Sequence, residues 1–144
     1  MARATYSLPE DFMDTISRLA ERTDEIVPRV LEAGGEVVLE QVRQNLNAVV
    51  GRDTQFPSRS TGELAGALGL SPAKLDRERN YNVKVGFNEP RRGTGDSNAK
   101  IANILEHGRH GQPPKPFLKP ARSSSREAAI DAMKRKMDEE VSRV

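Results

Sequence analysis

Apolar side chains recur every three or four residues through the first third of the chain, and this spacing predicts a long helical segment. The sequence Leu8-Pro9-Glu10-Asp11 indicates its start, because proline suits a first helical turn and acidic side chains favour the amide end of the helix dipole. Pro28 lacks an amide hydrogen and its ring clashes with the carbonyl of Asp24, so we expect a break or kink near residues 23–27. Gly34-Gly35 is predicted to be a second weak point. The stripe consists of Phe12, Ile16, Leu19, Ile26, Val30, Val38, Val42, Leu46 and Val49.

The sequence YNVKVGF, residues 81–87, alternates apolar and other side chains and predicts a half-buried strand. A single strand leaves backbone groups unpaired, so it needs a partner. Residues 68–70, the segment 71–80 and a neighbouring subunit are all candidates for that partner. Before them, Ser60 and Glu63 have the spacing of a capping box, which predicts a short helix that ends near Gly69.

Two further helices are predicted in the second half of the chain. Ser97 caps a short helix that Gly108 closes, and Pro120 lies in the first turn of a final amphipathic helix. The apolar stripe of the final helix is Ile130, Met133, Met137 and Val141. The predicted fold class is α+β, in a single domain spanning residues 1–144. Residues 8–50 form N-terminal helices broken near Pro28, residues 60–118 form a small antiparallel sheet with short helices and loops, and residues 119–144 form the C-terminal helix.

The composition predicts a thin hydrophobic core, because only 35% of the residues are hydrophobic, 31% are charged and tryptophan is absent. Helical chains of this kind often complete their burial in an oligomer, and disordered segments would give the same composition. The chain contains no cysteine, which excludes disulfides, thiolate zinc sites and cysteine nucleophiles. We find no signal peptide and no apolar run long enough for a membrane span, and we expect a soluble product made in the cytoplasm.

The segment ILEHGRHGQPPKPFLKPA, residues 104–121, raises the question of a metal site. Glu106, His107 and His110 are all metal-ligand types. The two histidines are three residues apart, however, and glycines interrupt any helix that would present them to one ion. A metal-dependent hydrolase is therefore disfavoured, and we expect Glu106 to cap nearby backbone amides or to meet an arginine.

The same segment presents an apolar pair, Phe117-Leu118, between prolines that hold the chain extended. Such a preorganised pair can hold the final helix on its own core, or it can insert into a partner protein. The two roles can coexist, and for Phe117 itself packing within the chain is favoured. The prolines are Pro113, Pro114, Pro116 and Pro120.

A cluster of basic side chains in the second half of the chain leaves non-specific DNA contact open as an alternative, secondary role. Aromatic residues that could stack on bases and motifs that read DNA sequence are missing, so an ordinary solvated or interface surface is favoured. The basic residues are Arg91, Arg92, Lys100, Arg109, Lys115, Lys119, Arg122 and Arg126.

Four short motifs occur in an order that resembles a family of tailed-bacteriophage neck proteins, the tail-completion or head–tail joining minor tail proteins of lambda-like siphophages. The resemblance covers about residues 8–144. The chain departs from the family pattern at His107 and Arg109, where members often have an aromatic residue and a threonine, and in its longer, proline-broken first helical segment. The motif residues are Thr61, Gly62 and Leu64; Val85, Gly86 and Phe87; Leu105, Glu106 and Gly108; and Pro116, Phe117, Leu118, Pro120 and Ala121.

The resemblance implies a structural virion protein with no catalytic activity and no cofactor. Such proteins assemble in the host cytoplasm into a homo-oligomeric ring, six-fold or twelve-fold, in the neck of the virion. The ring connects the head-completion or adaptor proteins at the portal to the tail terminator or tail tube. We expect loops 104–118 and 88–98 to contribute to these contacts. The predicted interface residues are Glu106, His107, Gly108, Arg109, Pro116, Phe117, Leu118, Arg91 and Arg92.

Overall fold

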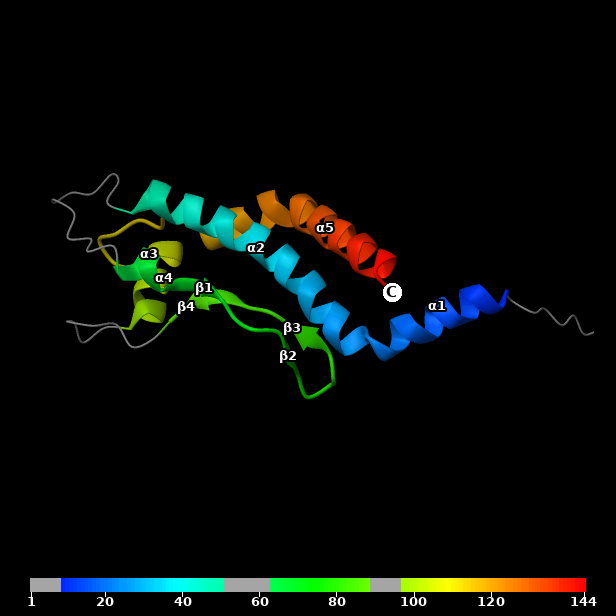
Figure 1. Ribbon diagram of the computed structural model, residues 1–144. Coiled ribbons are helices and arrows are strands. Elements are labelled where there is room, and N and C mark those ends of the chain that lie inside the picture. Colours follow the sequence, from blue (N-terminus) through cyan, green and yellow to red (C-terminus); the bar gives the residue numbers. More distant parts are fainter. Residues whose placement is uncertain (1–8, 51–62, 89–96) are drawn as a thin grey trace, which may run out of the picture.

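A computed structural model describes residues 9–50, 63–88 and 97–144. Two long helices, α2 and α5, lie side by side, and the short strands lie on the other side of α2 (Figure 1). The predicted α+β class, with N-terminal helices, a small antiparallel sheet and a C-terminal helix, is confirmed. In chain order the elements are α1 (Glu10–Glu21), α2 (Thr23–Val49), α3 (Glu63–Ala67), β1 (Leu68–Leu70), β2 (Lys74–Leu75), β3 (Tyr81–Asn82), β4 (Val85–Phe87), α4 (Asn98–His107) and α5 (Leu118–Ser142).

The N-terminal segment forms two helices that meet at Arg22, where φ is −102° and ψ is 7°. The predicted start holds, because Pro9 occupies the N-cap of α1. The predicted break is present, but it lies at Arg22, just before the expected span, and Pro28 itself lies within α2. Pro28 lacks the amide hydrogen that would donate to the carbonyl of Asp24, and that carbonyl lies in the first turn of α2, after the break.

The expected weak point at Gly34-Gly35 is wrong, since α2 continues through both glycines and both are buried. A Cβ on Gly34 would lie 2.6 Å from Met133 Cγ of α5, and a Cβ on Gly35 would lie 2.7 Å from Leu70 Cδ1 of β1. The two glycines therefore let α5 and β1 approach the backbone of α2 from different sides. Their value for packing outweighs their low helix propensity.

The strands form two separate two-stranded antiparallel sheets. β1 pairs with β4, with Leu68 opposite Phe87, and β2 pairs with β3. Between the two sheets the amide N–H of Lys84 donates to Ser71 Oγ and the amide N–H of Ser71 donates to the Lys84 carbonyl, both at 2.8 Å. The predicted strand 81–87 is divided there into β3 and β4. The two predicted partners within the chain, residues 68–70 and 71–80, are confirmed. The short helix ends at Ala67 rather than near Gly69, and the predicted cap Ser60 lies outside the described residues.

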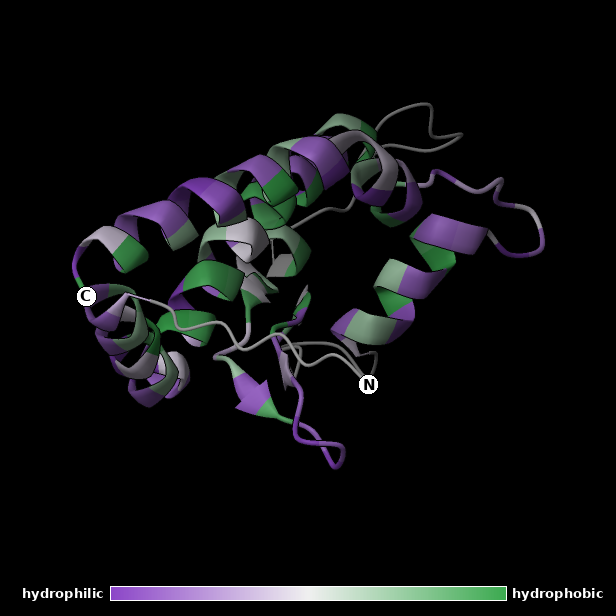
Figure 2. Ribbon diagram, turned by 90° about the vertical axis from the view of Figure 1, so that its right-hand side faces the viewer, coloured by the Kyte–Doolittle hydropathy of each residue, from purple (hydrophilic) through white to green (hydrophobic). Residues whose placement is uncertain are grey.

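One hydrophobic cluster joins the helices and the strands. The side chains of Phe117, Ala121 and Leu46 are fully buried in it. Hydrophilic residues lie along the outer sides of the long helices (Figure 2). The buried cluster consists of Leu39, Val42, Leu46, Leu64, Leu68, Ala102, Phe117 and Ala121.

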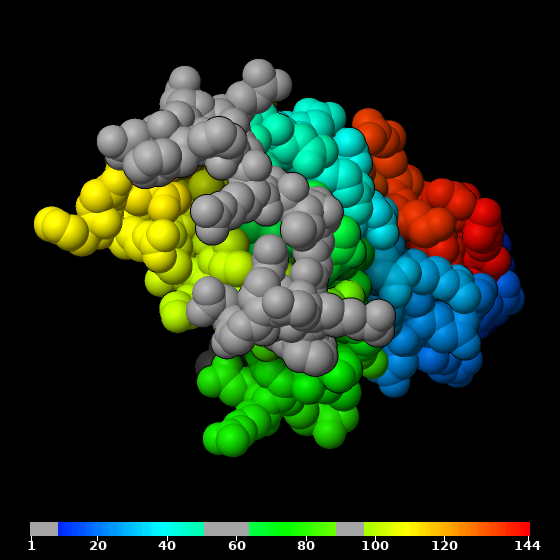
Figure 3. Space-filling view, turned by 90° about the vertical axis from the view of Figure 1, so that its left-hand side faces the viewer, coloured from blue at the N-terminus to red at the C-terminus, as the bar shows by residue number. Residues whose placement is uncertain are grey.

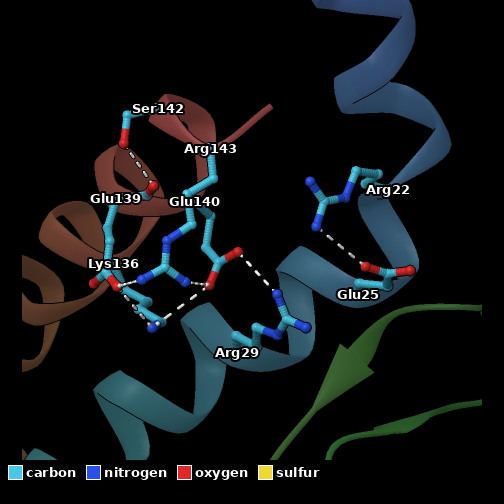
Figure 4. Close-up of polar contacts among 8 residues, drawn as sticks. All are labelled: Arg22, Glu25, Arg29, Lys136, Glu139, Glu140, Ser142 and Arg143. Atoms are coloured by element: carbon cyan, nitrogen blue, oxygen red, sulfur yellow. Dashed lines mark hydrogen bonds and ion pairs between the residues drawn. The ribbon is translucent and has the colours of Figure 1, made fainter.

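Helix α5 packs against α2 through small residues at its N-terminal end and through an acid at its C-terminal end. Ala121, Ser125 and Ala129 are buried and four residues apart, which places them on one face and allows close approach. Glu140 is also buried, and one of its oxygens lies 3.0 Å from Nη1 of Arg29 in α2 (Figure 4). Met137, which belongs to the predicted apolar stripe of this helix, is 39% exposed.

Candidate protein-interface site

Glu106 caps the start of α5 from the last turn of α4. Its Oε2 accepts hydrogen bonds from the backbone N–H groups of Phe117 at 2.7 Å and Leu118 at 2.9 Å, and its Oε1 accepts one from Lys119 at 3.0 Å. These N–H groups have no partner within the helix, so a carboxylate at this point satisfies them and interacts favourably with the helix dipole. The prediction that Glu106 caps backbone amides is confirmed.

The pKa of Glu106 is lowered from its usual value by the balance of two opposed causes. Burial is the largest single influence and raises the pKa, because it disfavours the charged form. The backbone hydrogen bonds from Leu118, Phe117 and Lys119, with a smaller contribution from His107, favour the carboxylate and outweigh burial. Glu106 therefore stabilises this junction as an anion.

Phe117 holds the proline-rich segment in the core of its own chain. Its side chain is fully buried, and its ring lies edge-on to Phe87 with 6.1 Å between ring centroids. Its carbonyl accepts a hydrogen bond from Asn45 Nδ2 of α2 at 3.2 Å. The prediction that Phe117 packs within the chain is confirmed, and the junction of β4, α4 and α5 depends on it.

The loop between α4 and α5, residues 108–117, turns tightly around two glycines. Gly108 ends α4 with φ +78°, and a Cβ there would lie 2.8 Å from both Gln112 O and Pro114 N. Backbone hydrogen bonds join Arg109 and Gln112 in both directions, at 3.0 and 2.9 Å. The predicted ends of α4 are confirmed, since Ser97 Oγ accepts from the Lys100 amide at its start and Gly108 closes it. The loop is therefore held in a defined shape.

The surface at this end of the molecule combines that loop with a groove. Figure 3 shows the segment around the loop, in yellow, standing out from the body. A shallow depression of about 490 Å³ runs along residues 107–114. A deeper and largely apolar groove of about 320 Å³ lies between β4, α4 and the start of α5. The groove is lined by Val85, Gly86, Phe87, Ala99, Ala102, Asn103, Glu106, His107 and Leu118.

The structure separates the predicted interface residues into two groups. Glu106 and Phe117 are buried in the core and support the loop, while His107, Arg109 and Pro116 are exposed and Leu118 is half-buried in the wall of the groove. Whether the exposed members contact another protein stays a prediction. Arg91 and Arg92, with most of the predicted loop 88–98, lie outside the described residues.

The histidines of this segment are both exposed. The carboxylate of Glu106 faces backbone amides of α5, and the structure assigns it no hydrogen bond to either histidine. In the part of the chain that the structure describes, no three His, Cys, Asp or Glu side chains are grouped so that they could hold a metal ion.

One candidate surface lies outside every predicted site residue. No residue of α1 is buried, and Phe12, Met13 and Ile16 are 50%, 46% and 44% exposed. The sequence did contain the signal, because Phe12, Ile16 and Leu19 form the N-terminal part of the predicted stripe. The pattern predicted an apolar helix face that is buried against other residues. It did not indicate that, among the described residues, no other part of the chain packs over the α1 portion of that face.

Comparison with known proteins identifies one family. A family model described as "Bacteriophage HK97-gp10, putative tail-component" matches residues 10–108, which is more than half of the chain. No curated protein and no solved structure gives a match. None of the described helices combines the length and apolarity that a membrane span needs.

Proposed function

Since the chain belongs to the HK97-gp10-like family of bacteriophage tail components, we propose that it is a ring-forming subunit of the phage neck. As a tail component it is part of the virion and contacts other structural proteins of the phage. In the proposed role, copies of the chain form a ring that connects the portal-side adaptor complex of the capsid to the tail. The proposed subunit performs no catalysis and binds no cofactor.

The observation that carries the proposal is the uncovered apolar face of α1. Soluble monomers rarely leave contiguous large hydrophobic side chains in water, and such faces mark sites of protein contact. Here Phe12 and Ile16 lie one helical turn apart and are about half exposed. A subunit that completes its burial only on assembly would have this property.

A second feature supports an assembly role. The loop at residues 108–117 is exposed, yet Glu106 and the buried Phe117 hold both of its ends. A loop that is ordered before binding loses little entropy on binding, so it suits a contact that must be formed by every subunit of a ring.

The proposal can be tested with a phage that lacks this gene. Without the protein, we expect filled heads and finished tails to accumulate unjoined in electron micrographs of lysates, and we expect the wild-type protein supplied in trans to restore joining. Normal joined virions without the protein would refute the proposal.

A charge-reversal pair then examines the loop. Arg109→Glu changes an exposed side chain of the loop, and Arg77→Glu makes the same change at an exposed position in the turn between β2 and β3. We expect Arg109→Glu to lower the number of joined particles and Arg77→Glu to leave it unchanged. If both variants give the same number of joined particles, the loop is not part of the proposed interface.

Non-specific contact with DNA is a second candidate function. Residues 107–126 contain five lysines and arginines and no acidic residue. Such a segment could neutralise phosphates where DNA passes through the neck, and binding would then fall steeply with salt concentration. Titration of a labelled duplex at two salt concentrations tests this role, and binding that does not depend on salt would exclude it.

A further inference from the structure

Helix α1 (Glu10–Glu21) projects from the rest of the chain and is named the arm. Phe12, Ile16 and Leu19 lie at positions i, i+4 and i+7, which places them on one face. Among the described residues five large hydrophobic side chains are exposed, and three of them belong to α1. The helix extends away from the helices and strands that form the core (Figure 1). An apolar stripe is thus presented to solvent at one end of the molecule.

The joint at Arg22 holds the arm in a defined direction. The Arg22 amide donates to the carbonyls of Arg18 and Leu19, both at 3.2 Å, and its carbonyl accepts from the amides of Glu25 and Ile26. Its guanidinium also lies 3.5 Å from the carboxylate of Glu25 (Figure 4). The arm therefore continues from α2 through a hydrogen-bonded joint.

The largely apolar groove lies at the opposite end of α2, beyond the reach of the arm of the same chain. Asn45 binds the carbonyl of Phe117 beside the groove, and 23 residues of helix between Arg22 and Asn45 span about 35 Å. The 12 residues of α1 span only about 18 Å. An arm folded back along α2 would end about halfway to the groove, so any α1 helix in the groove must come from another copy.

Helix α1 and the segment that borders the groove carry opposite charge. Four carboxylates of α1, those of Glu10, Asp11, Asp14 and Glu21, accompany a single arginine, Arg18. The segment 107–126, which borders the groove, has five basic residues and no acid, and the one acid in the groove lining, Glu106, has its carboxylate bound to backbone amides of α5. Arg122 follows Leu118 by one helical turn, so it extends from the groove wall along the same face of α5.

These charges favour one occupant over the alternatives. Pairing of two α1 helices would bring two acidic helices together, and an anionic lipid surface would repel the acidic polar side of the arm. The basic rim of the groove attracts it. Asp14 and Glu21 lie on the side of α1 opposite its apolar stripe, so their attraction to the basic residues acts across the width of the helix. The charges therefore mainly guide the approach of α1 to the groove, while the apolar side chains make the contact.

We propose that the apolar stripe of α1 docks into the groove between β4, α4 and the start of α5 of the next copy of the chain. Such a contact joins two different surfaces, so repetition builds a ring if the rotation between copies closes. The inference rests on the proposed function, because it assumes that copies assemble. Each contact involves one short helix and is small, so it gains strength from closure of the ring rather than from one pair.

The absence of cysteine from the chain permits a direct test by disulfide trapping. The full-length chain carrying both Ile16→Cys and Asn103→Cys has one thiol on the arm and one at the groove. On mild oxidation we expect a ladder of disulfide-linked multimers on a non-reducing gel, since the two sites cannot meet within one copy. At about 1 M salt, where the Debye length is only about 3 Å, the ladder should form more slowly.

Two controls decide what the ladder means. Leu75→Cys with Asn103→Cys has an equally exposed apolar position outside the arm, because Leu75 is 46% exposed and Ile16 is 44% exposed. It should give no ladder. Ile16→Cys alone should remain monomeric. Equal ladders from both pairs, no ladder from either, or dimers from Ile16→Cys alone would each overturn the docking of α1 in the groove.

Joining of heads and tails separates this inference from the proposed function. We expect Ile16→Ser to lose joining in the gene-deletion phage and Leu75→Ser to retain it. Full joining with Ile16→Ser would overturn the arm contact while leaving the role in the neck intact. Full joining without any copy of the gene would instead overturn the role in the neck.

Discussion

Replacing Glu106 by alanine should be among the most destabilising single changes in this chain. The Phe117 N–H is buried and would lose its acceptor, while the Leu118 and Lys119 N–H groups are partly exposed and water could replace theirs. Loss of a charged acceptor costs about 2–3 kcal/mol at a buried donor, and loss of a helix cap costs about 1 kcal/mol more. We therefore expect Glu106→Ala to lower the free energy of unfolding by about 3–4 kcal/mol.

Urea unfolding measures this change directly. With a slope near 2 kcal/mol per molar urea, the midpoint should fall by roughly 2 M without a change of slope. Glu127→Ala is the matched control, because Glu127 is an exposed glutamate of α5. It should shift the free energy by no more than about 0.5 kcal/mol. A loss below about 1 kcal/mol for Glu106→Ala would refute the capping argument.

The dependence on pH tests whether the charge of Glu106 matters. Its folded-state pKa is lowered, so ionised Glu106 stabilises the fold fully above its unfolded pKa of about 4.3. That contribution is lost as the pH falls through the lowered value. Glu106→Gln keeps the shape without the charge, so its deficit should be largest near neutral pH and should narrow in acid. A deficit that does not change with pH would contradict the argument.

Three further substitutions test other parts of the fold by urea unfolding. Gly108→Ala should cost at least about 1–3 kcal/mol, because φ is +78° and a Cβ would meet backbone atoms at 2.8 Å, while Gly66→Ala, with open space around it, should cost nothing. A neutral Gly108→Ala would contradict that geometry. Phe117→Ala should cost about 3–5 kcal/mol by leaving a cavity in the core, and a loss below 1 kcal/mol would show that the site collapses. Burial raises the pKa of Glu140, but the hydrogen bond to Arg29 and the other interactions with basic groups outweigh it and leave the pKa lowered. The loss of unfolding free energy caused by Glu140→Gln should therefore become smaller as the pH falls, and a loss that does not change with pH would argue against the ion pair.

Features that depend on residues within about four positions of each other were predictable from the sequence. Pro9 begins α1, Ser97 caps α4, and Gly108 ends α4, each as expected from its residue type. These features follow from local backbone preferences and hydrogen bonds, which the sequence states directly.

The glycine pair in α2 shows where such local reasoning is insufficient. Helix propensity alone makes Gly34 and Gly35 a point of weakness. In the fold they lie against Met133 of α5 and Leu70 of β1, residues that are far away along the chain. Propensity describes an isolated helix, and the structure adds the contacts that decide whether the helix continues.

The candidate site was predicted in part for the same reason. The sequence indicated that Glu106 caps amides and that Phe117 packs inward, but the identity of the amides, 11 to 13 residues later, depends on how α4 and α5 meet. It also gave one continuous apolar stripe over residues 12–49, with no difference between its two ends. The structure covers the α2 part of that stripe and leaves the α1 part in solvent.

The sequence by itself determined where most helices and strands form, which residues begin and end them, and which side of each helix is apolar. Only the tertiary structure decided which of those apolar sides are covered, because burial depends on segments far apart in the chain. That decision leaves α1 without a partner at one end of the molecule and an apolar groove with a basic rim at the other.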